Sequence, residues 1–381
     1  MRDGREDVKV DIAVVGAGTM GAGIAESVAL AGMSVTMLDV GEEALERGRH
    51  TIERDLERRV KKERLSEEES RDVLDRISTT TSVGDLSGVS LVVEAVVEDM
   101  EVKRKVFADL EGAVGDEAVL ATNTSSLSVS GIATATENPE RVVGMHFFNP
   151  VPAMRLVEVV AGPSTEESAL RRAEEVAGWL GKTPVRVSDT PGFIVNRVAQ
   201  PFYLEALRIV ESGGAPAQID AEIRGAGFRM GPLELADLIG LDVNLAVSES
   251  LFERYYCHPR FRPSFLQRSM VEAGTLGRKS GRGFYDYRDE RRGEISAPSE
   301  EEVARRIISC IVNEAFLAHS EGVATTEDID RAMKLGANYP KGPFEWADEI
   351  GAASILNTLD SLRATHGDAY VAAPALREIV R

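Results

Sequence analysis

The chain has 381 residues, of which 43% are hydrophobic and 28% charged, the balance of a folded protein with two or three domains. It carries 63 acidic and 44 basic residues, a net charge of −19, which argues against a general nucleic-acid binder because such proteins present a broad basic face. Cys257 and Cys310 are too few for a disulfide framework or a cysteine zinc site, and we expect no metal. No apolar run reaches the ~18–20 residues of a membrane helix and the start has no apolar signal core, so we expect a cytoplasmic protein that does not attach to membranes.

The first half of the chain alternates predicted strands and helices. Residues 8–15 predict a buried strand, glycines follow, and a helix over 20–31 leads to a second strand over 34–38. The pattern then predicts a charged helix at 42–64, a strand at 89–96, a helix at 100–110, and strands at 118–121, 142–146, 156–160 and 183–187. This alternation favours a mostly parallel sheet that helices cover on both faces.

The second half is helical in pattern and repeats itself. Glu205-Ala206 recurs as Glu314-Ala315, Ile219-Asp220 as Ile329-Asp330, and GPLELADLIG (231–240) as GPFEWADEIG (342–351). The offset grows only from 109 to 111 residues, which predicts a tandem repeat of a small all-α domain. We expect a first copy at 191–287, a charged linker at 288–302 and a second, degenerate copy at 303–381.

A glycine-rich turn joins the first predicted strand to its helix. It consists of Gly16, Ala17, Gly18, Thr19, Met20 and Gly21. Gly16 permits the tight turn, Gly18 lets the backbone approach a pyrophosphate, and Gly21 allows close packing of helix on strand. Asp39 follows at the end of the second strand, where it can bind both ribose hydroxyls and would repel a 2′-phosphate. The context predicts a Rossmann-type domain over 8–190 that binds NAD; a glycine turn with a capping aspartate is the alternative.

Polar residues follow the later strands. Asn123 and Ser125 come directly after one strand, His146 ends another, and Glu158 lies on an apolar strand face, where a carboxylate is costly to bury without a partner. A loop with two prolines joins the last two strands, so His146 and Glu158 can lie side by side. Such a pair fixes the imidazole tautomer and stabilises its protonated form, as a general base for alcohol oxidation requires. The alternatives are a packed histidine at a strand end and, for Ser125, a turn residue.

Five motifs carry a resemblance to a known family. In chain order they are VVGAGTMGAGIA, NTSSLS, HFFNPVPAMRLVEVV, DTPGFIVNR and KSGRGFYDY, and they resemble the L-3-hydroxyacyl-CoA dehydrogenases, including 3-hydroxybutyryl-CoA dehydrogenases. The resemblance covers residues 8–287, and the repeat extends it to 351. It implies reversible NAD-dependent oxidation of L-3-hydroxyacyl-CoA to 3-ketoacyl-CoA in fatty-acid or butanoate metabolism. Two alternatives stay open: a related dehydrogenase for a free hydroxy acid or a sugar acid of the gulonate type, and a non-catalytic NAD-binding protein.

The resemblance also implies roles for single residues. His146 takes the proton of the 3-hydroxyl, Glu158 orients His146, and Ser125 and Asn196 bind the substrate. Besides the glycine turn and Asp39, the cofactor contacts it implies are Glu98, Lys103, Asn123, Ser125, Asn149 and Lys279. Lys62 matches a lysine that contacts coenzyme A, whereas Asp55 stands where the family often has a hydroxyl residue. Helix caps, turns and solvated faces are the structural alternatives for these polar residues.

The predicted repeat bears on the oligomeric state. In relatives with one helical domain, that domain forms the dimer interface. A second copy could fill this interface within one chain, so the resemblance implies either a monomer with an internal pseudo-dimer or a homodimer. Aligning Glu205 with Glu314 places Arg305 opposite Asn196, so we interpret the second copy as structural.

Overall fold

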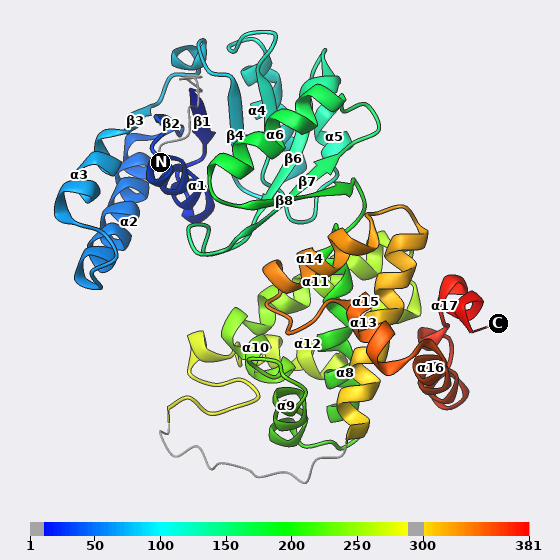
Figure 1. The fold of residues 1–381 in the computed structure, drawn as a ribbon. Coiled ribbons are helices and arrows are strands. Elements are labelled where there is room, and N and C mark those ends of the chain that lie inside the picture. The colour runs from blue at the N-terminus through cyan, green and yellow to red at the C-terminus, as the bar shows by residue number, and fades with distance from the viewer. Residues whose placement is uncertain (1–10, 289–300, 381) are drawn as a thin grey trace, which may run out of the picture. The chain divides into compact units, whose positions relative to one another are not determined.

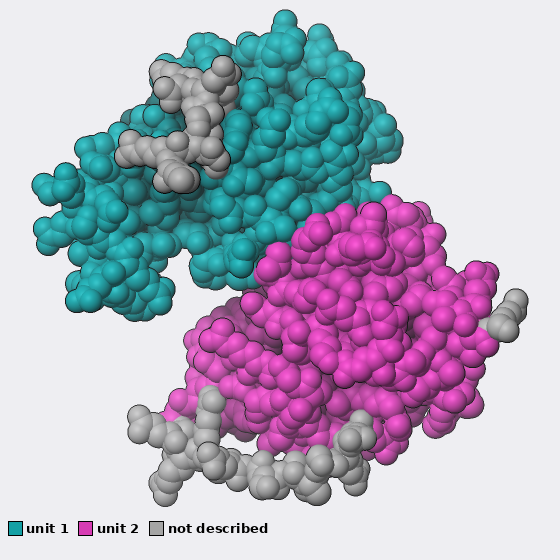
Figure 2. Space-filling view, in the orientation of Figure 1, with its two compact units in different colours: residues 1–189 teal, residues 190–381 magenta. Residues whose placement is uncertain are grey.

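The chain divides into two compact units between Asp189 and Thr190 (Figure 2). The computed structural model describes residues 11–288 and 301–380. The first three residues of the strand predicted at 8–15 and most of the linker predicted at 288–302 lie outside the described residues. None of the described helices has both the length and the apolar character that crossing a bilayer requires.

Unit 1, residues 1–189, is an α/β domain built on one eight-stranded sheet (Figure 1). Its strands are β1 (Ile12–Val15), β2 (Val35–Leu38), β3 (Ile77–Thr80), β4 (Leu91–Glu94), β5 (Val119–Thr122), β6 (Val142–Phe147), β7 (Leu156–Ala161) and β8 (Thr183–Ser188). Its helices are α1 (Thr19–Leu30), α2 (Glu42–Lys61), α3 (Glu67–Asp75), α4 (Met100–Glu111), α5 (Val129–Ala133) and α6 (Glu167–Trp179), with short 3₁₀ turns η1 (Val83–Leu86) and η2 (Pro139–Arg141).

The strand order β3-β2-β1-β4-β5-β6-β7-β8 places the site. Strands β1 to β6 pair in parallel, β7 is antiparallel to β6, and β8 is parallel to β7. The predicted mostly parallel sheet of Rossmann type is therefore confirmed. The order reverses between β1 and β4, and in such sheets ligands bind outside the carboxyl ends of the strands at this point.

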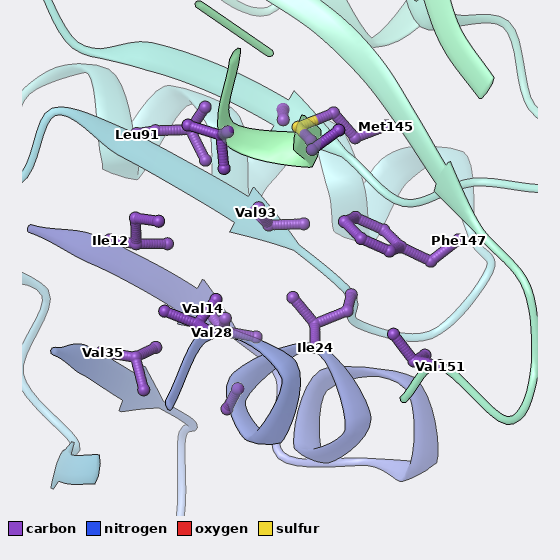
Figure 3. Close-up of a cluster of buried hydrophobic side chains, with 14 of the residues drawn as sticks. Ile12, Val14, Ile24, Val28, Val35, Leu91, Val93, Met145, Phe147 and Val151 are labelled. Atoms are coloured by element: carbon purple, nitrogen blue, oxygen red, sulfur yellow. The ribbon is translucent and has the colours of Figure 1, made fainter. Parts of the chain in front are cut away.

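The core of unit 1 explains why its central strands are almost entirely apolar. All four residues of β1 and of β4 are buried, as expected for parallel strands with helices on both faces. Figure 3 shows Ile24 and Val28 of α1 pointing toward strand side chains that include Val93 and Phe147. Val151, from the loop after β6, packs against the same helix. The helix that follows the glycine turn is thus held against the sheet and against this loop.

The sequence pattern missed four elements of unit 1: α3, β3, α5 and α6. The predicted helix at 42–64 ends earlier, at Lys61, because Glu63 adopts a left-handed φ of 54°. Ser66 then caps α3 through a capping box with Glu69, a signal that the sequence contains. Strand β3 gives a weak signal because only Ile77 of its four residues is buried.

A buried carboxyl group lies between α1 and α2. Glu26 is 3% exposed, and Arg59 Nε lies 3.2 Å from Glu26 Oε1 and 2.9 Å from Asp55 Oδ2. Burial, together with the neighbouring Asp55, raises the pKa of Glu26 to about 8, although Arg59 opposes the shift. The folded chain therefore keeps a proton that the unfolded chain releases near pH 4.5.

We expect the contribution of Glu26 to the free energy of unfolding to fall by a few kcal/mol as the pH rises from 4.5 to 8, because at this residue the folded state then binds more protons than the unfolded state. Glu26→Gln should remove the part of the pH dependence that comes from Glu26. The stability of this variant relative to the wild type should therefore increase with pH. Urea unfolding at pH 5.5 and 8.5 measures the effect, with Glu46→Gln on exposed α2 surface as the control. Parallel pH profiles for wild type and Glu26→Gln would contradict the assignment.

Unit 2, residues 190–381, is helical. Its helices are α7 (Val195–Val198), α8 (Gln200–Glu211), α9 (Pro216–Gly225), α10 (Pro232–Ile239), α11 (Leu241–Arg254), α12 (Phe265–Glu272), α13 (Glu301–Ser320), α14 (Thr326–Gly336), α15 (Pro343–Ile350), α16 (Ala352–His366) and α17 (Pro374–Ile379), with 3₁₀ turns η3 (Pro259–Phe261), η4 (Arg278–Ser280) and η5 (Asp368–Tyr370). Helix α13 begins at Glu301, two residues before the predicted second copy.

The same local arrangement occurs twice in unit 2. Asp220 accepts hydrogen bonds from the N–H groups of Leu233 (3.0 Å) and Glu234 (2.9 Å) at the start of α10. Asp330 accepts them from Phe344 (2.8 Å) and Glu345 (3.2 Å) at the start of α15. The glycine before each helix is required, because a Cβ atom there would lie within 2.4 Å of the aspartate. Each aspartate thus binds N–H groups that a helix N-terminus leaves unpaired.

Helices α8 and α13 pack side by side (Figure 1), and two ion pairs join the α7–α8 segment to α13 reciprocally. Arg197, just before α8, pairs with Glu314 of α13 at 2.7 Å, and Arg306 of α13 pairs with Glu205 of α8 at 2.9 Å. Arg197 and Arg306 are 109 residues apart, as are Glu205 and Glu314. Each arginine therefore binds the glutamate that is equivalent to the partner of the other arginine. Such reciprocal contacts are the pattern of an interface with two-fold symmetry.

Candidate active site

The glycine turn lies at the carboxyl end of β1, where the strand order reverses. Gly16 has φ 103°, and a Cβ atom there would lie 2.6 Å from the Ala95 carbonyl oxygen; one on Gly21 would lie 1.8 Å from the Gly16 carbonyl oxygen. A Cβ atom on Gly18 would meet no atom within 4 Å. The open side of Gly18 gives a ligand access to the start of α1, whose unpaired N–H groups and positive dipole end suit a phosphate.

Asp39 holds the turn while presenting its carboxylate. Its Oδ2 accepts a hydrogen bond from the Ala17 N–H and its Oδ1 one from the Val40 N–H, each at 2.8 Å. Each carboxylate oxygen has a second lone pair, so both can still accept a hydrogen bond from a ribose hydroxyl. The geometry fits the predicted role of Asp39 in binding NAD. It also gives Asp39 a structural role, because the side chain joins the glycine turn to the end of β2.

A cavity of about 580 Å³ opens beside this turn. Its walls are the glycine turn, Asp39, the segment after β4 and an apolar set that consists of Leu38, Val83, Val102, Val106 and Leu110. Val40 and Val97 also line it and are 98% and 66% exposed, unusual for valine. An apolar cavity beside a phosphate-binding turn and a ribose-binding acid fits the adenosine half of a dinucleotide.

A buried network lies behind this cavity at the ends of β4 and β5. Lys103 has no exposed surface, and its ammonium group donates to both oxygens of Glu94, at 2.7 and 3.0 Å. Thr122 donates to Glu94 as well, at 2.7 Å, and Lys103 Nζ lies 3.4 Å from Glu98 Oε2. Contact between Lys103 and the cofactor stays a prediction. In the structure its ammonium group joins Glu94 to Glu98 in the protein interior.

Glu98 organises the loop that follows β5. Its Oε1 accepts hydrogen bonds from the Thr124 hydroxyl (2.6 Å), the Ser125 N–H (2.9 Å) and the Ser126 hydroxyl (3.1 Å). These bonds and nearby Lys103 hold the pKa of Glu98 below its ordinary value, although burial opposes them. Glu98 thus remains ionised and fixes Ser125 at the carboxyl edge of the sheet.

His146 and Glu158 face each other across β6 and β7. They are direct partners in the antiparallel register, and His146 Nδ1 lies 2.6 Å from Glu158 Oε2. Glu158 has no exposed surface and His146 is 6% exposed. A carboxylate accepts hydrogen bonds, so this contact requires a hydrogen on Nδ1 of His146.

The surroundings of this pair keep it in place. The Asn123 side chain accepts a hydrogen bond from the Phe147 N–H at 3.0 Å, which joins β5 to the residue after His146. The loop between the two strands is held by buried Lys182, which lies just before β8. Its ammonium group donates hydrogen bonds to the carbonyl oxygens of Val151 (2.7 Å) and Met154 (2.8 Å). Burial lowers the pKa of Lys182 to about 8. Asn149 lies in the same loop, and its contact with the cofactor stays a prediction.

The remaining predicted residues lie elsewhere. Lys62 is exposed directly after α2, and Asp55 pairs with Arg59. Asn196 in α7 and Lys279 in η4 belong to unit 2, where Lys279 donates a 2.6 Å hydrogen bond to Asp242. Their contacts with substrate and cofactor stay predictions. Unit 1 itself brings together the glycine turn and Asp39, links Glu98 to Ser125, and pairs His146 with Glu158.

The sequence analysis missed three charged groups that support the site: Glu94 and Lys182, which are buried, and Asp189, which is half-buried. Asp189 accepts hydrogen bonds from Ser128 and Ser130 and holds the start of α5. Only Glu94 gave a signal, as the single charged residue in the apolar run LVVEAVV.

The fold and this site define a dinucleotide-binding dehydrogenase with a histidine–carboxylate pair. Residues 11–190 match the family model for the NAD-binding domain of 3-hydroxyacyl-CoA dehydrogenase, and residues 192–287 and 303–381 match that for its C-terminal domain. The chain belongs to the 3-hydroxyacyl-CoA dehydrogenase family.

Similar proteins cover between 72% and 97% of this chain. A 3-hydroxyadipyl-CoA dehydrogenase of Escherichia coli K12 is 38% identical over 94% of both chains. A 3-hydroxybutyryl-CoA dehydrogenase of Mycobacterium tuberculosis is 47% identical over 72% of this chain and 98% of its own length. The crystal structure of 3-hydroxybutyryl-CoA dehydrogenase from E. coli K12 superposes with a TM-score of 0.92 at 37% identity, covering 97% of this chain and 98% of that one.

Proposed function

We propose that the chain oxidises L-3-hydroxyacyl-CoA to 3-ketoacyl-CoA with NAD, reversibly, and that His146 moves the proton. The observation that carries the proposal is the 2.6 Å contact between His146 Nδ1 and buried Glu158, at the edge of the sheet that also holds the glycine turn. NAD, held by the glycine turn and Asp39, supplies the hydride acceptor when bound.

The proton chemistry follows from the pair. During oxidation the 3-hydroxyl gives its proton to His146 Nε2, C3 loses a hydride, and the C3–O bond becomes a carbonyl. Glu158 stabilises the imidazolium that forms and keeps Nε2 as the reacting nitrogen. In the reverse direction the imidazolium returns the proton to the 3-keto oxygen. We assign Ser125, whose N–H is held by Glu98, a hydrogen bond to that oxygen as charge develops, and we assign Asn196 the same task.

NADH absorbance tests this function. We expect NADH to be consumed with acetoacetyl-CoA but not with free acetoacetate, since the latter lacks the coenzyme A portion, and we expect NADPH to be a poor substitute. Turnover of free acetoacetate alone would favour the hydroxy-acid alternative. Binding of NADH without turnover of any ketoacyl substrate would favour a non-catalytic protein.

We further propose that 303–381 is a second, degenerate copy of the helical domain at 191–287 and forms an internal pseudo-dimer with it. The reciprocal pairs Arg197–Glu314 and Arg306–Glu205, and the two aspartate-capped helices, support this reading. The second copy carries Arg305 where the first has Asn196, so its role is structural. A monomer containing this pseudo-dimer and a homodimer of such chains both fit, and the cytoplasmic location also stays a prediction.

A further inference from the structure

The loop that joins β6 to β7, residues 148–155, contacts both the reacting pair and the helix that follows the glycine turn. The ring of its first residue lies with its centre 4.4 Å from that of the His146 ring, and the loop ends where β7, the strand of Glu158, begins. In its middle, Val151 is 2% exposed and packs against α1, where a Cβ atom on Gly23 would lie 3.0 Å from Val151 Cβ (Figure 3). A shift of this loop would therefore disturb the surroundings of His146.

One cation holds this loop from outside. Lys182 is 8% exposed, and its ammonium group donates hydrogen bonds to the carbonyl oxygens of Val151 (2.7 Å) and Met154 (2.8 Å). Hydrogen bonds from a charged donor are stronger than those from a neutral one. Because the two carbonyl groups belong to the middle and to the end of the loop, the ammonium group keeps these two parts of the loop in one arrangement.

The ammonium group of Lys182 has no acid partner among residues 11–288 and 301–380, which the structure describes. The one charged residue of the loop, Arg155, is exposed, and the charged residues of α1, α6, β7 and β8 have other partners. They are Glu26, paired with Arg59; Glu158, paired with His146; Glu167 and Glu174, paired with Arg186; Arg171, paired with Glu167; and Arg172, paired with Glu175. Burial alone therefore lowers the pKa of Lys182 to about 8, and at higher pH the side chain becomes a neutral, weaker donor.

We propose that Lys182 is a positioning residue for the reaction: its ammonium group fixes the loop 148–155 and thereby holds His146 where it exchanges a proton with the substrate. This inference rests on the proposed function, in which His146 takes the proton of the 3-hydroxyl. Lys182 itself moves no proton of the reaction and acts through the loop. A displacement of about 1 Å in a reacting group can lower a rate ~10²-fold, so the position of this loop is important for turnover.

Lys182→Met removes the ammonium group and keeps an unbranched side chain. We expect kcat for oxidation of 3-hydroxybutyryl-CoA by NAD to fall about 10- to 100-fold at pH 7, because His146 is no longer held in place. The matched control is Arg141→Met. Arg141 is also a buried cation that donates to loop carbonyl groups, those of Gly115 (2.8 Å) and Asp116 (3.2 Å), but it lies before β6, at the end of that strand away from His146. Its loss should lower stability toward urea and leave kcat unchanged.

The pH profile separates positioning from a general loss of stability. During oxidation kcat rises as His146 becomes neutral, and we expect it to fall again above about pH 8, where Lys182 loses its proton. Unfolding does not explain such a fall: the pKa of Lys182 is lowered on folding, so its contribution to stability rises between about pH 8 and 10.5. Lys182→Gln should have a lower kcat at pH 7 and should lack the fall. A fall like that of the wild type in this variant would overturn the proposal.

Hydrogen–deuterium exchange of the full chain tests the hold on the loop without activity. The N–H groups of Ala153 and Met154, which donate to the Pro150 carbonyl at 3.0 and 3.1 Å, should exchange faster in Lys182→Met and at the wild-type rate in Arg141→Met. Unchanged exchange in Lys182→Met, faster exchange with wild-type kcat, or an equal loss of kcat in Arg141→Met would overturn the proposal. A wild type that turns over no 3-hydroxyacyl-CoA would refute the proposed function, and with it the role of Lys182 in the reaction, while the exchange rates still show whether Lys182 holds the loop.

Discussion

Replacing His146 with glutamine should lower kcat for acetoacetyl-CoA reduction by about 10²- to 10⁴-fold, the contribution of a positioned general acid or base. Glutamine keeps a polar side chain of similar reach beside Glu158 but cannot transfer a proton. The cofactor cavity is built from the glycine turn, Asp39 and the segment after β4, so binding of NADH should be unchanged. Steady-state NADH oxidation measures the first effect, and quenching or enhancement of NADH fluorescence measures the second.

The histidine control is His50→Gln, which removes an exposed imidazole of α2 in the same unit. It should leave both kcat and NADH binding at wild-type values. A His146→Gln enzyme with wild-type turnover would remove His146 from the chemistry. Parallel loss of turnover and of NADH binding would instead point to a damaged fold.

Glu314→Ala should destabilise the protein by about 3–5 kcal/mol, because it leaves two buried or half-buried arginines with the exposed Glu321 as their remaining acid partner. Arg197 Nε lies 2.7 Å and Arg260 Nε 3.0 Å from Glu314. Glu205→Ala should have an effect of similar size, since Glu205 pairs with Arg208 and Arg306 in the equivalent place. Urea unfolding followed by circular dichroism gives the free energies of unfolding.

An exposed ion pair of the same unit provides the comparison. Asp360 pairs with Arg377 at 2.5 Å, with the side chains 49% and 36% exposed, and Asp360→Ala should cost less than about 1 kcal/mol. If Glu205→Ala and Glu314→Ala each cost as little as this control, the reciprocal pairs do not hold the two helical copies together. If only one of them is costly, the interface lacks the two-fold character that we infer from the repeat.

Local patterns predicted the main features of unit 1 because their signals lie close together in sequence. The glycine turn between β1 and α1, followed by Asp39, needs no information from elsewhere in the chain. The partnership of His146 with Glu158 was predictable because only one short loop joins their strands and because an acid on an apolar strand face requires a partner.

The missed features depend on contacts between distant segments. Glu94 is satisfied by Lys103 and by Thr122, which lies 28 residues away. Asp189 binds Ser130 across 59 residues, and Lys182 binds the carbonyl oxygen of Val151 across 31. No periodicity or motif reports such pairs, because the sheet brings them together.

A crystal structure of the His146→Gln enzyme with NAD and 3-hydroxybutyryl-CoA tests the central claim most directly, because the variant should bind the substrate without turning it over. We predict that the 3-hydroxyl oxygen lies within about 2.6–3.2 Å of the side chain at position 146, with Glu158 on the opposite side of that residue. A 3-hydroxyl bound to another acid or base, and out of hydrogen-bonding reach of position 146, would contradict the account.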